Sequence, residues 1–208
     1  AAITTTFDGV DTTTEHESMT AVAVAGADGS LQLADGTAVQ ATVTCTSGAG
    51  VVGVATSALV TLDTTPPTVG HVFDGPPGES LAVHASSSSI DANWLAFVDP
   101  HSTIAGYTVC YGTAPGVCDA SSSVDAGVLL TTSVPLSVED GTTVFATVVA
   151  TNNAGLTTNS SSNGVLVDGS VPETTAAVVY NGLNFESQGV VGHGNVFASW
   201  TGFTDQHT

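Results

Sequence analysis

The sequence predicts an all-β protein built from tandem antiparallel β-sandwiches that repeat about every 105 residues. Three observations predict this fold class. Val and Thr, which favour strands, are abundant, and no long segment has the apolar spacing of a helix. Short alternating segments are separated by turns rich in Gly, Pro and Asp. Finally, Asp35-Gly-Thr returns as Asp140-Gly-Thr 105 positions later, and Trp94 returns as Trp200 106 positions later.

The repeat sets the predicted domain division. Two prolines in the segment Asp63-Thr-Thr-Pro-Pro cannot donate hydrogen bonds to a sheet, so one domain should end there. We expect residues 1–65 to be the C-terminal part of a sandwich, 66–170 a complete sandwich and 171–208 the N-terminal part of a further one. The last part would be completed by the next subunit or by continuation of the chain.

The first half of the complete unit should hold four strands. We expect them at 69–74, at 81–84 after the turn Gly75-Pro-Pro-Gly78, at 90–94 and at 104–111. Residues 90–94 alternate, which would direct Ile90, Ala92 and Trp94 into the core.

The second half should supply three or four more strands. Residues 124–136 predict one or two, and 142–151 follow the tight-turn signal Asp140-Gly141 with alternate apolar residues; the last is expected at 163–168. The serine runs 86–89, 121–123 and 160–162 are predicted as polar loops.

These residues resemble a fibronectin type III domain, one of the immunoglobulin-like sandwiches. The resemblance is carried by Trp94, by Ile104-x-Gly-Tyr-x-Val-x-Tyr111, by Leu136-x-x-x-x-Gly-Thr142 and by Val148-x-Ala-x-Asn-x-x-Gly155. The linker and the Trp-x-x-Phe-x-Asp segment are similar to tandem repeats of large extracellular surface proteins, mastigoneme-like fibrils among them. One departure is Val144, with Val39 in the earlier copy, where the family usually has a tyrosine at a strand corner.

The charge balance excludes several functions. The chain has no Lys or Arg against 19 Asp plus Glu, so it lacks the cations that bind nucleic-acid phosphates or anionic membranes. No apolar run approaches the ~20 residues that span a bilayer. The sequence has no Gly-x-Ser-x-Gly elbow and no phosphate-binding Gly-rich loop, so we expect no enzyme.

Two features favour an extracellular setting. Cys110 and Cys118 flank the turn-like segment 112–116, and a hairpin there would bring them into a disulfide; the alternative is two separate buried thiols. Cys45 lies outside the repeat pattern and is expected to be a free thiol. Asn159-Ser-Ser is an N-glycosylation sequence, which we expect in a surface loop.

Metal binding is the weaker hypothesis for the histidines. His101 and His207 are equivalent by the repeat and each follows an Asp by two residues, an arrangement that could bind a divalent ion or simply face solvent in a turn. Asp63, Asp74 and Asp99 lie near expected interdomain turns and are candidates for structural Ca²⁺. Because the Asp-x-Asp-x-Asp-Gly loop is absent, the prediction is no metal and no cofactor.

The two part-domains suggest the function. Each alone would expose an apolar face, and joining them would bury Phe197, Trp200 and Phe203 of one against Ile3 and Phe7 of the other. Head-to-tail contacts of this kind give open filaments. The predicted function is therefore a glycosylated structural subunit of an extracellular fibril whose partner is itself. The alternative is a cell-surface adhesion module that binds carbohydrate or protein.

Overall fold

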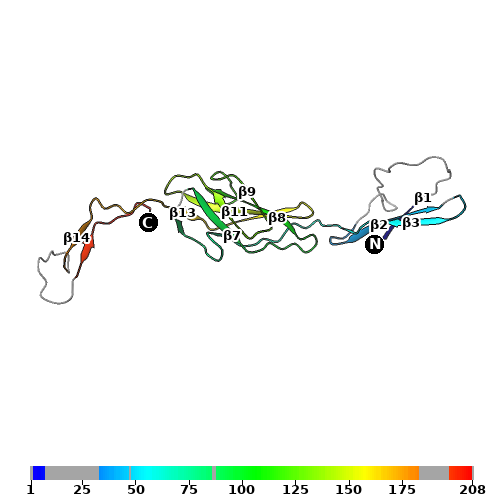
Figure 1. Ribbon diagram of the computed structural model, residues 1–208, viewed down its shortest axis with the longest axis horizontal. Coiled ribbons are helices and arrows are strands. Elements are labelled where there is room, and N and C mark those ends of the chain that lie inside the picture. Colours follow the sequence, from blue (N-terminus) through cyan, green and yellow to red (C-terminus); the bar gives the residue numbers. More distant parts are fainter. Residues whose placement is uncertain (1, 8–32, 47, 86–87, 183–196, 208) are drawn as a thin grey trace. The chain divides into compact units, whose positions relative to one another are not determined.

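The structure is a computed structural model that describes residues 2–7, 33–46, 48–85, 88–182 and 197–207 (Figure 1). Over these residues the protein is all-β, with several sheets and no helix, as the sequence predicts. The part of the chain described here accordingly has no helix long and apolar enough to cross a membrane. The chain divides into two compact units, the first of residues 1–70, 96–107 and 149–158 and the second of the remainder.

The first unit contains a sheet built around β2 (Ala38–Thr46). Strand β1 (Ala2–Phe7) pairs with β2 in parallel, while β3 (Val52–Thr56) and β4 (Val60–Thr61) pair with it antiparallel. The β2–β3 hairpin turns at Gly50, whose φ of 78° is a conformation that glycine adopts without steric cost. All five residues of β3 are exposed, so this sheet has no second layer over β3 in the described residues.

The second unit contains a three-stranded sheet in the order β10-β7-β5. Its members are β5 (Val72–Asp74), β7 (Ser89–Trp94) and β10 (Thr131–Pro135), and both neighbours pair antiparallel with β7. The alternation predicted for β7 is observed, because Ile90, Ala92 and Trp94 are all buried.

A six-stranded sheet lies in the order β6-β13-β11-β8-β9, with β12 also paired to β11. Its strands are β6 (Val83–His84), β8 (Ile104–Gly112), β9 (Val124–Gly127), β11 (Thr143–Asn152), β12 (Thr157–Ser161) and β13 (Val165–Val167). A separate pair, β14 (Val178–Tyr180) and β15 (Ser199–Thr201), is antiparallel.

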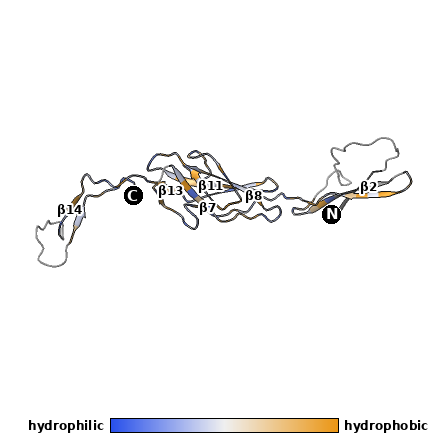
Figure 2. Cartoon of the chain, in the orientation of Figure 1, coloured by the Kyte–Doolittle hydropathy of each residue, from blue (hydrophilic) through white to orange (hydrophobic). Residues whose placement is uncertain are grey.

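The apolar core lies on the three-stranded and six-stranded sheets. Val144, Ala146, Val148 and Ala150 form an unbroken alternating row on β11, fully buried, and the hydrophobic colouring of β11 in Figure 2 follows it. Alternate burial along a strand means that one face packs inward and the other faces out.

Hydrogen bonds tie the two sheets together. The Tyr111 hydroxyl on β8 donates to the Asp91 carbonyl on β7 at 3.1 Å. Asp74 on β5 accepts from the Ala146 amide on β11 at 3.2 Å and from the Ser162 hydroxyl at 2.7 Å. Two layers joined across a buried apolar face are consistent with a β-sandwich.

Strand β12 is the main difference from the sequence prediction. The sequence predicts a loop for Asn159 and the serine run 160–162, but residues 157–161 form a strand that pairs with β11 and includes Asn159. Polar side chains bond across this pair: the Thr147 and Ser161 hydroxyl oxygens lie 3.0 Å apart. The next residue, Ser162, is buried rather than part of a flexible loop.

We predict that Ser162→Ala lowers the free energy of unfolding by about 1–3 kcal/mol at pH 7, because it removes a donor to the buried Asp74. Burial raises the pKa of Asp74 and the Ser162 hydroxyl opposes that rise. The loss should therefore be smaller near pH 4, where Asp74 is more protonated. Urea denaturation at both pH values measures it. Exposed Ser133→Ala is the control, and an equal loss at both pH values would contradict the assignment.

Candidate functional site

The first site is a contact between an Asp-Gly turn and a histidine turn, both in the first unit. We call it the first Asp–His site and define it by Asp35, Gly36, Asp63, Asp99 and His101. His101 Nε2 lies 3.3 Å from Asp35 Oδ2, and both side chains are about one quarter exposed. The pair is ionic when the imidazole is protonated. His101 therefore does not simply face solvent.

The His101 imidazole packs directly against the backbone of Gly36, which we call the seat of the ring. The φ of Gly36 is 76°, and a Cβ atom built there would lie only 2.7 Å from Cε1 and Nδ1 of His101. The Gly36 amide donates to the Leu62 carbonyl at 2.9 Å, which fixes the turn. Glycine is thus required twice, by its backbone conformation and by the ring that lies against it.

Backbone and hydroxyl donors hold the Asp35 carboxylate. The Thr64 amide donates to Oδ1 at 2.7 Å, and the Thr65 hydroxyl donates to Oδ2. These bonds, first that of the Thr65 hydroxyl and then that of the Thr64 amide, lower the pKa of Asp35, with a smaller contribution from His101. The carboxylate is thereby kept charged opposite the imidazole.

Asn152 links the other two carboxylates of the site. Its Nδ2 group donates to Asp63 Oδ2 at 2.9 Å and to Asp99 Oδ2 at 3.0 Å. Asp99 also accepts from the amides of His101 and Ser102, which orients the histidine turn. The Asn152 bond, followed by the Ser102 amide, lowers the pKa of Asp99 to about 2.

A second Asp–His site in the second unit repeats this geometry. It consists of Asp140, Gly141, Asp168, Asp205 and His207, each the repeat equivalent of a first-site residue. His207 Nε2 lies 3.5 Å from Asp140 Oδ2. A Cβ atom on Gly141, whose φ is 80°, would lie 2.6 Å from His207 Cε1. The seat and the ring therefore recur together.

The surrounding hydrogen bonds recur as well. The Gly169 amide donates to Asp140, as Thr64 does to Asp35. The His207 amide donates to Asp205 at 3.0 Å, the distance found between His101 and Asp99.

The second site also has the spacing of a metal-ligand group. Ligand atoms of Asp140, Asp168 and His207 all lie within 4.8 Å of one another, the one such group that the described residues contain. Two carboxylates and an imidazole suit a divalent ion. Asp140 and Asp168 also accept hydrogen bonds through their Oδ1 atoms from the amides of Gly169 and Ser170, and we assign no metal to this group. At the first site Asp63 bonds to Asn152, while Asp74 bonds within the second unit.

The structure joins Cys110 and Cys118 in a disulfide, with their Cα atoms 5.5 Å apart. Asn159 is exposed on β12, where its side chain is open to modification. The side chains of Ile3, Phe7 and Cys45 lie outside what the structure describes.

The remaining predicted assembly residues are exposed. Trp200 is 63% exposed, whereas its repeat equivalent Trp94 is 3% exposed. Phe203 is 47% exposed against 3% for Phe97. Phe197 is also exposed, but the repeat spacing aligns it with Asp91, which is not a core residue. The β14–β15 pair and the residues beside it thus expose Trp200 and Phe203, whereas Trp94 and Phe97 at the corresponding earlier positions are buried.

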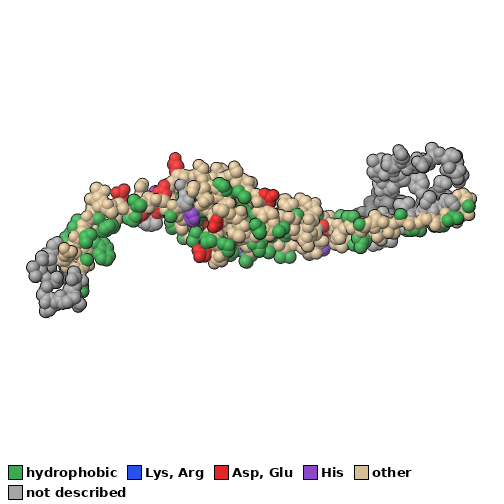
Figure 3. Space-filling model, viewed as in Figure 1, with side chains coloured by type: hydrophobic (Ala, Val, Ile, Leu, Met, Phe, Trp, Pro, Cys, Tyr) green, Lys and Arg blue, Asp and Glu red, His purple; other side chains and the backbone are tan. Residues whose placement is uncertain are grey.

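The first unit shows the same contrast on β4. Val60 is 63% exposed, whereas its equivalent on β13, Val165, is fully buried. Val51, Val52 and Val54 on and beside β3 are exposed too. Figure 3 shows apolar and acidic side chains at the surface of the face drawn, and no Lys or Arg.

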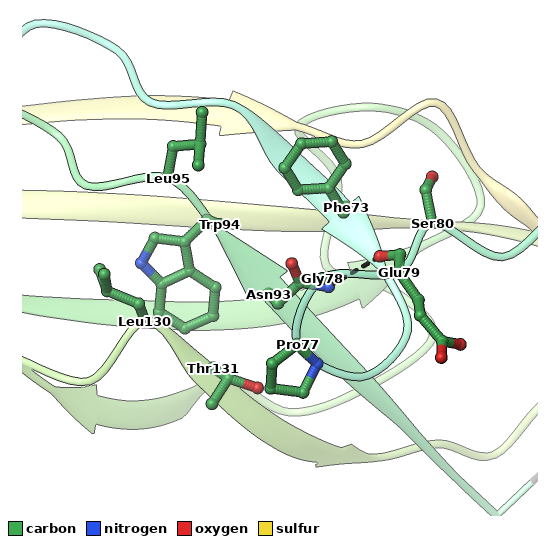
Figure 4. Close-up of a pocket in the computed structure, with 10 residues that line it drawn as sticks. All are labelled: Phe73, Pro77, Gly78, Glu79, Ser80, Asn93, Trp94, Leu95, Leu130 and Thr131. Carbon is green, nitrogen blue, oxygen red and sulfur yellow. Dashed lines mark hydrogen bonds between the residues drawn. The ribbon is translucent and has the colours of Figure 1, made fainter.

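A shallow pocket of about 450 Å³ lies on the three-stranded sheet of the second unit (Figure 4). Phe73, Leu95 and Leu130 give it an apolar lining. Asn93 at its edge donates to the carbonyls of Gly75, Pro76 and Glu79, so this amide holds the 75–79 loop. The Asn93 amide is therefore already bonded by the chain, while Glu79, Ser80 and Thr131 are further polar residues of the lining.

Sequence reasoning found the equivalence of the histidines but missed their partners. Asp35-Gly and Asp140-Gly were recognised only as repeated turns, and Asn152 only as part of a family pattern. The available signal was the common spacing: the Asp-Gly turns lie 105 positions apart and the histidines 106. Comparison with protein-family models and with curated proteins found no match.

We predict that Gly36→Ala displaces the His101 imidazole and breaks its contact with Asp35. Gly50→Ala is a matched control, because Gly50 has nearly the same φ but no atom within 4 Å of its Cβ position. Both variants should lose about 1 kcal/mol from backbone strain. In the wild type we expect a nuclear Overhauser effect between His101 Hε1 and the Hα atoms of Gly36. The corresponding signal, to the Hα of residue 36, should be lost in Gly36→Ala and kept in Gly50→Ala. Persistence of this signal would contradict the seat.

We predict that Asn152→Ala raises the pKa of Asp99 from about 2 toward its ordinary value of 3.8. A carboxyl group whose pKa is lowered in the folded state adds stability at pH values above its ordinary pKa, and this stability is lost as the pH falls toward 2. The free energy of unfolding of the variant should therefore decrease less than that of the wild type between pH 4 and 2. Carboxyl ¹³C titration measures the pKa. Asn153→Ala, which removes bonds to Ser102 and Thr103 instead, should leave it near 2.

Proposed function

We propose that this chain is a structural subunit of an extracellular fibril or cell-surface appendage, assembled head-to-tail as copies complete each other's split β-sandwich domains. The observation that carries the proposal is the exposure of residues whose repeat equivalents are buried, Trp200 against Trp94 above all. Proteins rarely leave such faces open, because covering them is strongly favourable. The occupant that fits is a sheet of the same fold.

Strand register supports tandem domains of one type. In the first unit Ala38 pairs with Thr61 and Val39 with Val60. In the six-stranded sheet Thr143 pairs with Leu166 and Val144 with Val165, each position exactly one repeat later. Strands β3 and β12 likewise begin and end 105 positions apart. This agreement supports our assignment of residues 1–65 to a sandwich of the fibronectin type III type.

The chemistry of the surface supports an extracellular setting. The Cys110–Cys118 disulfide requires an oxidising compartment to persist. Asn159 begins an N-glycosylation sequence and is exposed on β12. We therefore include covalent glycans among the partners and exclude nucleic acid, since no Lys or Arg is available to contact phosphate. Catalysis forms no part of the proposal.

The pocket on the three-stranded sheet favours the alternative function, an adhesion module for carbohydrate or protein. Phe73 offers a partly exposed aromatic ring there, with the His71 ring packed edge-on at 4.7 Å. Stacking on such a ring is one way to hold a sugar. A chain that stays monomeric and binds glycan in a Phe73-dependent manner would favour this function over the fibril.

The proposed assembly predicts that the chain associates with increasing concentration in analytical ultracentrifugation. Trp200→Ala should weaken association about 100-fold or more, because truncation of a buried Trp costs about 3–5 kcal/mol. Leu129→Ala is the control, since Leu129 is equally exposed but has no part in the proposed interface.

Two outcomes would contradict assembly between copies. One is a chain that stays monomeric at all concentrations. The other is equal association by the Trp200 and Leu129 variants. An intact polypeptide whose mass greatly exceeds 20.5 kDa plus glycans would instead show that the sandwich is completed by continuation of the same chain.

A further inference from the structure

We propose that each Asp–His site is a docking contact between consecutive domains that tightens when its histidine gains a proton. The partner is the next domain of the same chain: its Asp-x-His turn docks on the Asp-Gly turn of the domain before it. The inference rests on the domain division of the proposed function, but not on assembly between copies.

The first argument is recurrence. Two places in the chain, 105 to 106 positions apart, make the same contacts: a histidine Nε2 lies near an aspartate Oδ2, and the same imidazole lies where a Cβ atom of a glycine would be. In both, the histidine amide donates at 3.0 Å to the aspartate two residues earlier, which presents the ring in a fixed direction. A contact by chance between surface turns would not repeat in its partner atoms and its supporting bonds.

The second argument is the fit of the seat. Gly36 and Gly141 leave room for an imidazole against the backbone, and a side chain at either position would occupy the place of the ring. Among the left-handed glycines, Gly50 and Gly155 have no atom within 4 Å of an added Cβ, while Gly164 has the Phe145 ring at 2.6 Å, so only some of the tight turns here admit such a close approach. The ring therefore recognises a particular turn.

The third argument is charge. The chain has no Lys or Arg, so histidine is the only side chain that can become a cation beside its carboxylates. The groups around His101 are Asp35 on the preceding turn, Asp99 on its own turn and Asp63, which Asn152 joins to Asp99. All are acids.

The second site has the same charge pattern. Asp140 and Asp168 lie within ligand distance of His207, and Asp205 holds its amide. A proton on the imidazole is attracted by every ionised neighbour at each site and repelled by none of those named. Because a protonated imidazole is attracted to these carboxylates, acidification from pH 8 to 5.5 should strengthen docking.

The size of the effect follows from exposure. Both pairs are partly solvated, and exposed ion pairs of this kind change an equilibrium by about two- to fivefold. Asp35 stays ionised at pH 5.5, since hydrogen bonds hold its pKa below the ordinary range. The response should therefore appear between pH 8 and 5.5 and reverse only in stronger acid.

The test compares rotational correlation times of residues 33–65 and 66–170 by ¹⁵N relaxation. It uses the full chain with EDTA, at a concentration where it is monomeric. In the wild type the two times should converge as the pH falls from 8 to 5.5, with a two- to fivefold gain in the docked-to-undocked ratio. His101→Gln and Gly36→Ala should lose that gain, while the controls His71→Gln and Gly50→Ala should keep it.

A gain that survives in His101→Gln, or that disappears in His71→Gln, overturns the inference. So does a wild-type chain whose two correlation times do not change between the two pH values. The measurement is made within one chain, so a failure of self-association in the ultracentrifuge leaves its result readable. Conversely, association that is intact with no pH response would refute the docking contact alone.

Discussion

The lack of any lysine or arginine governs how this protein satisfies its carboxylates. In most proteins a buried or half-buried acid finds a cationic partner, but here the donors must be amides, hydroxyls and imidazoles. Asp74 receives the amides of Ala146 and Gly164 and the hydroxyl of Ser162. Asp119 receives the amide and hydroxyl of Thr113. Carboxylates thus bind the backbone directly, and Asp74 links segments that are distant in sequence.

This manner of bonding gives each acid a local geometry. A backbone amide offers one hydrogen in one direction, whereas a lysine ammonium on a flexible stem can approach from many. Tyr111 also bonds to the backbone: its hydroxyl donates to a carbonyl of the facing sheet. Burial raises the pKa of this hydroxyl. The two sheets are therefore held in register by directional bonds as well as by apolar packing.

The sequence predicted the strands that have apolar alternation and missed the one that does not. Residues 90–94 and 142–151 were located to within a residue or so, because a buried face imposes a period of two. Strand β12 has no such face; its place is set by pairing with β11 and by the Thr147–Ser161 contact, which local composition does not encode. Gly36 and His101 are 65 positions apart, so only the folded chain could reveal one as the seat of the other.

The exposure of strand β3 affects how readily a single chain could mispair with other strands. Every residue of it is exposed, and it stands at the end of its sheet order. An uncovered strand of Val, Ala and Thr is a template for any extended segment, correct or not. In the assembly that we propose, each free copy would risk mispairing until its partner binds, and a competing flat stack of like strands would be hard to reverse. The rate of the proposed association would then matter as much as its strength.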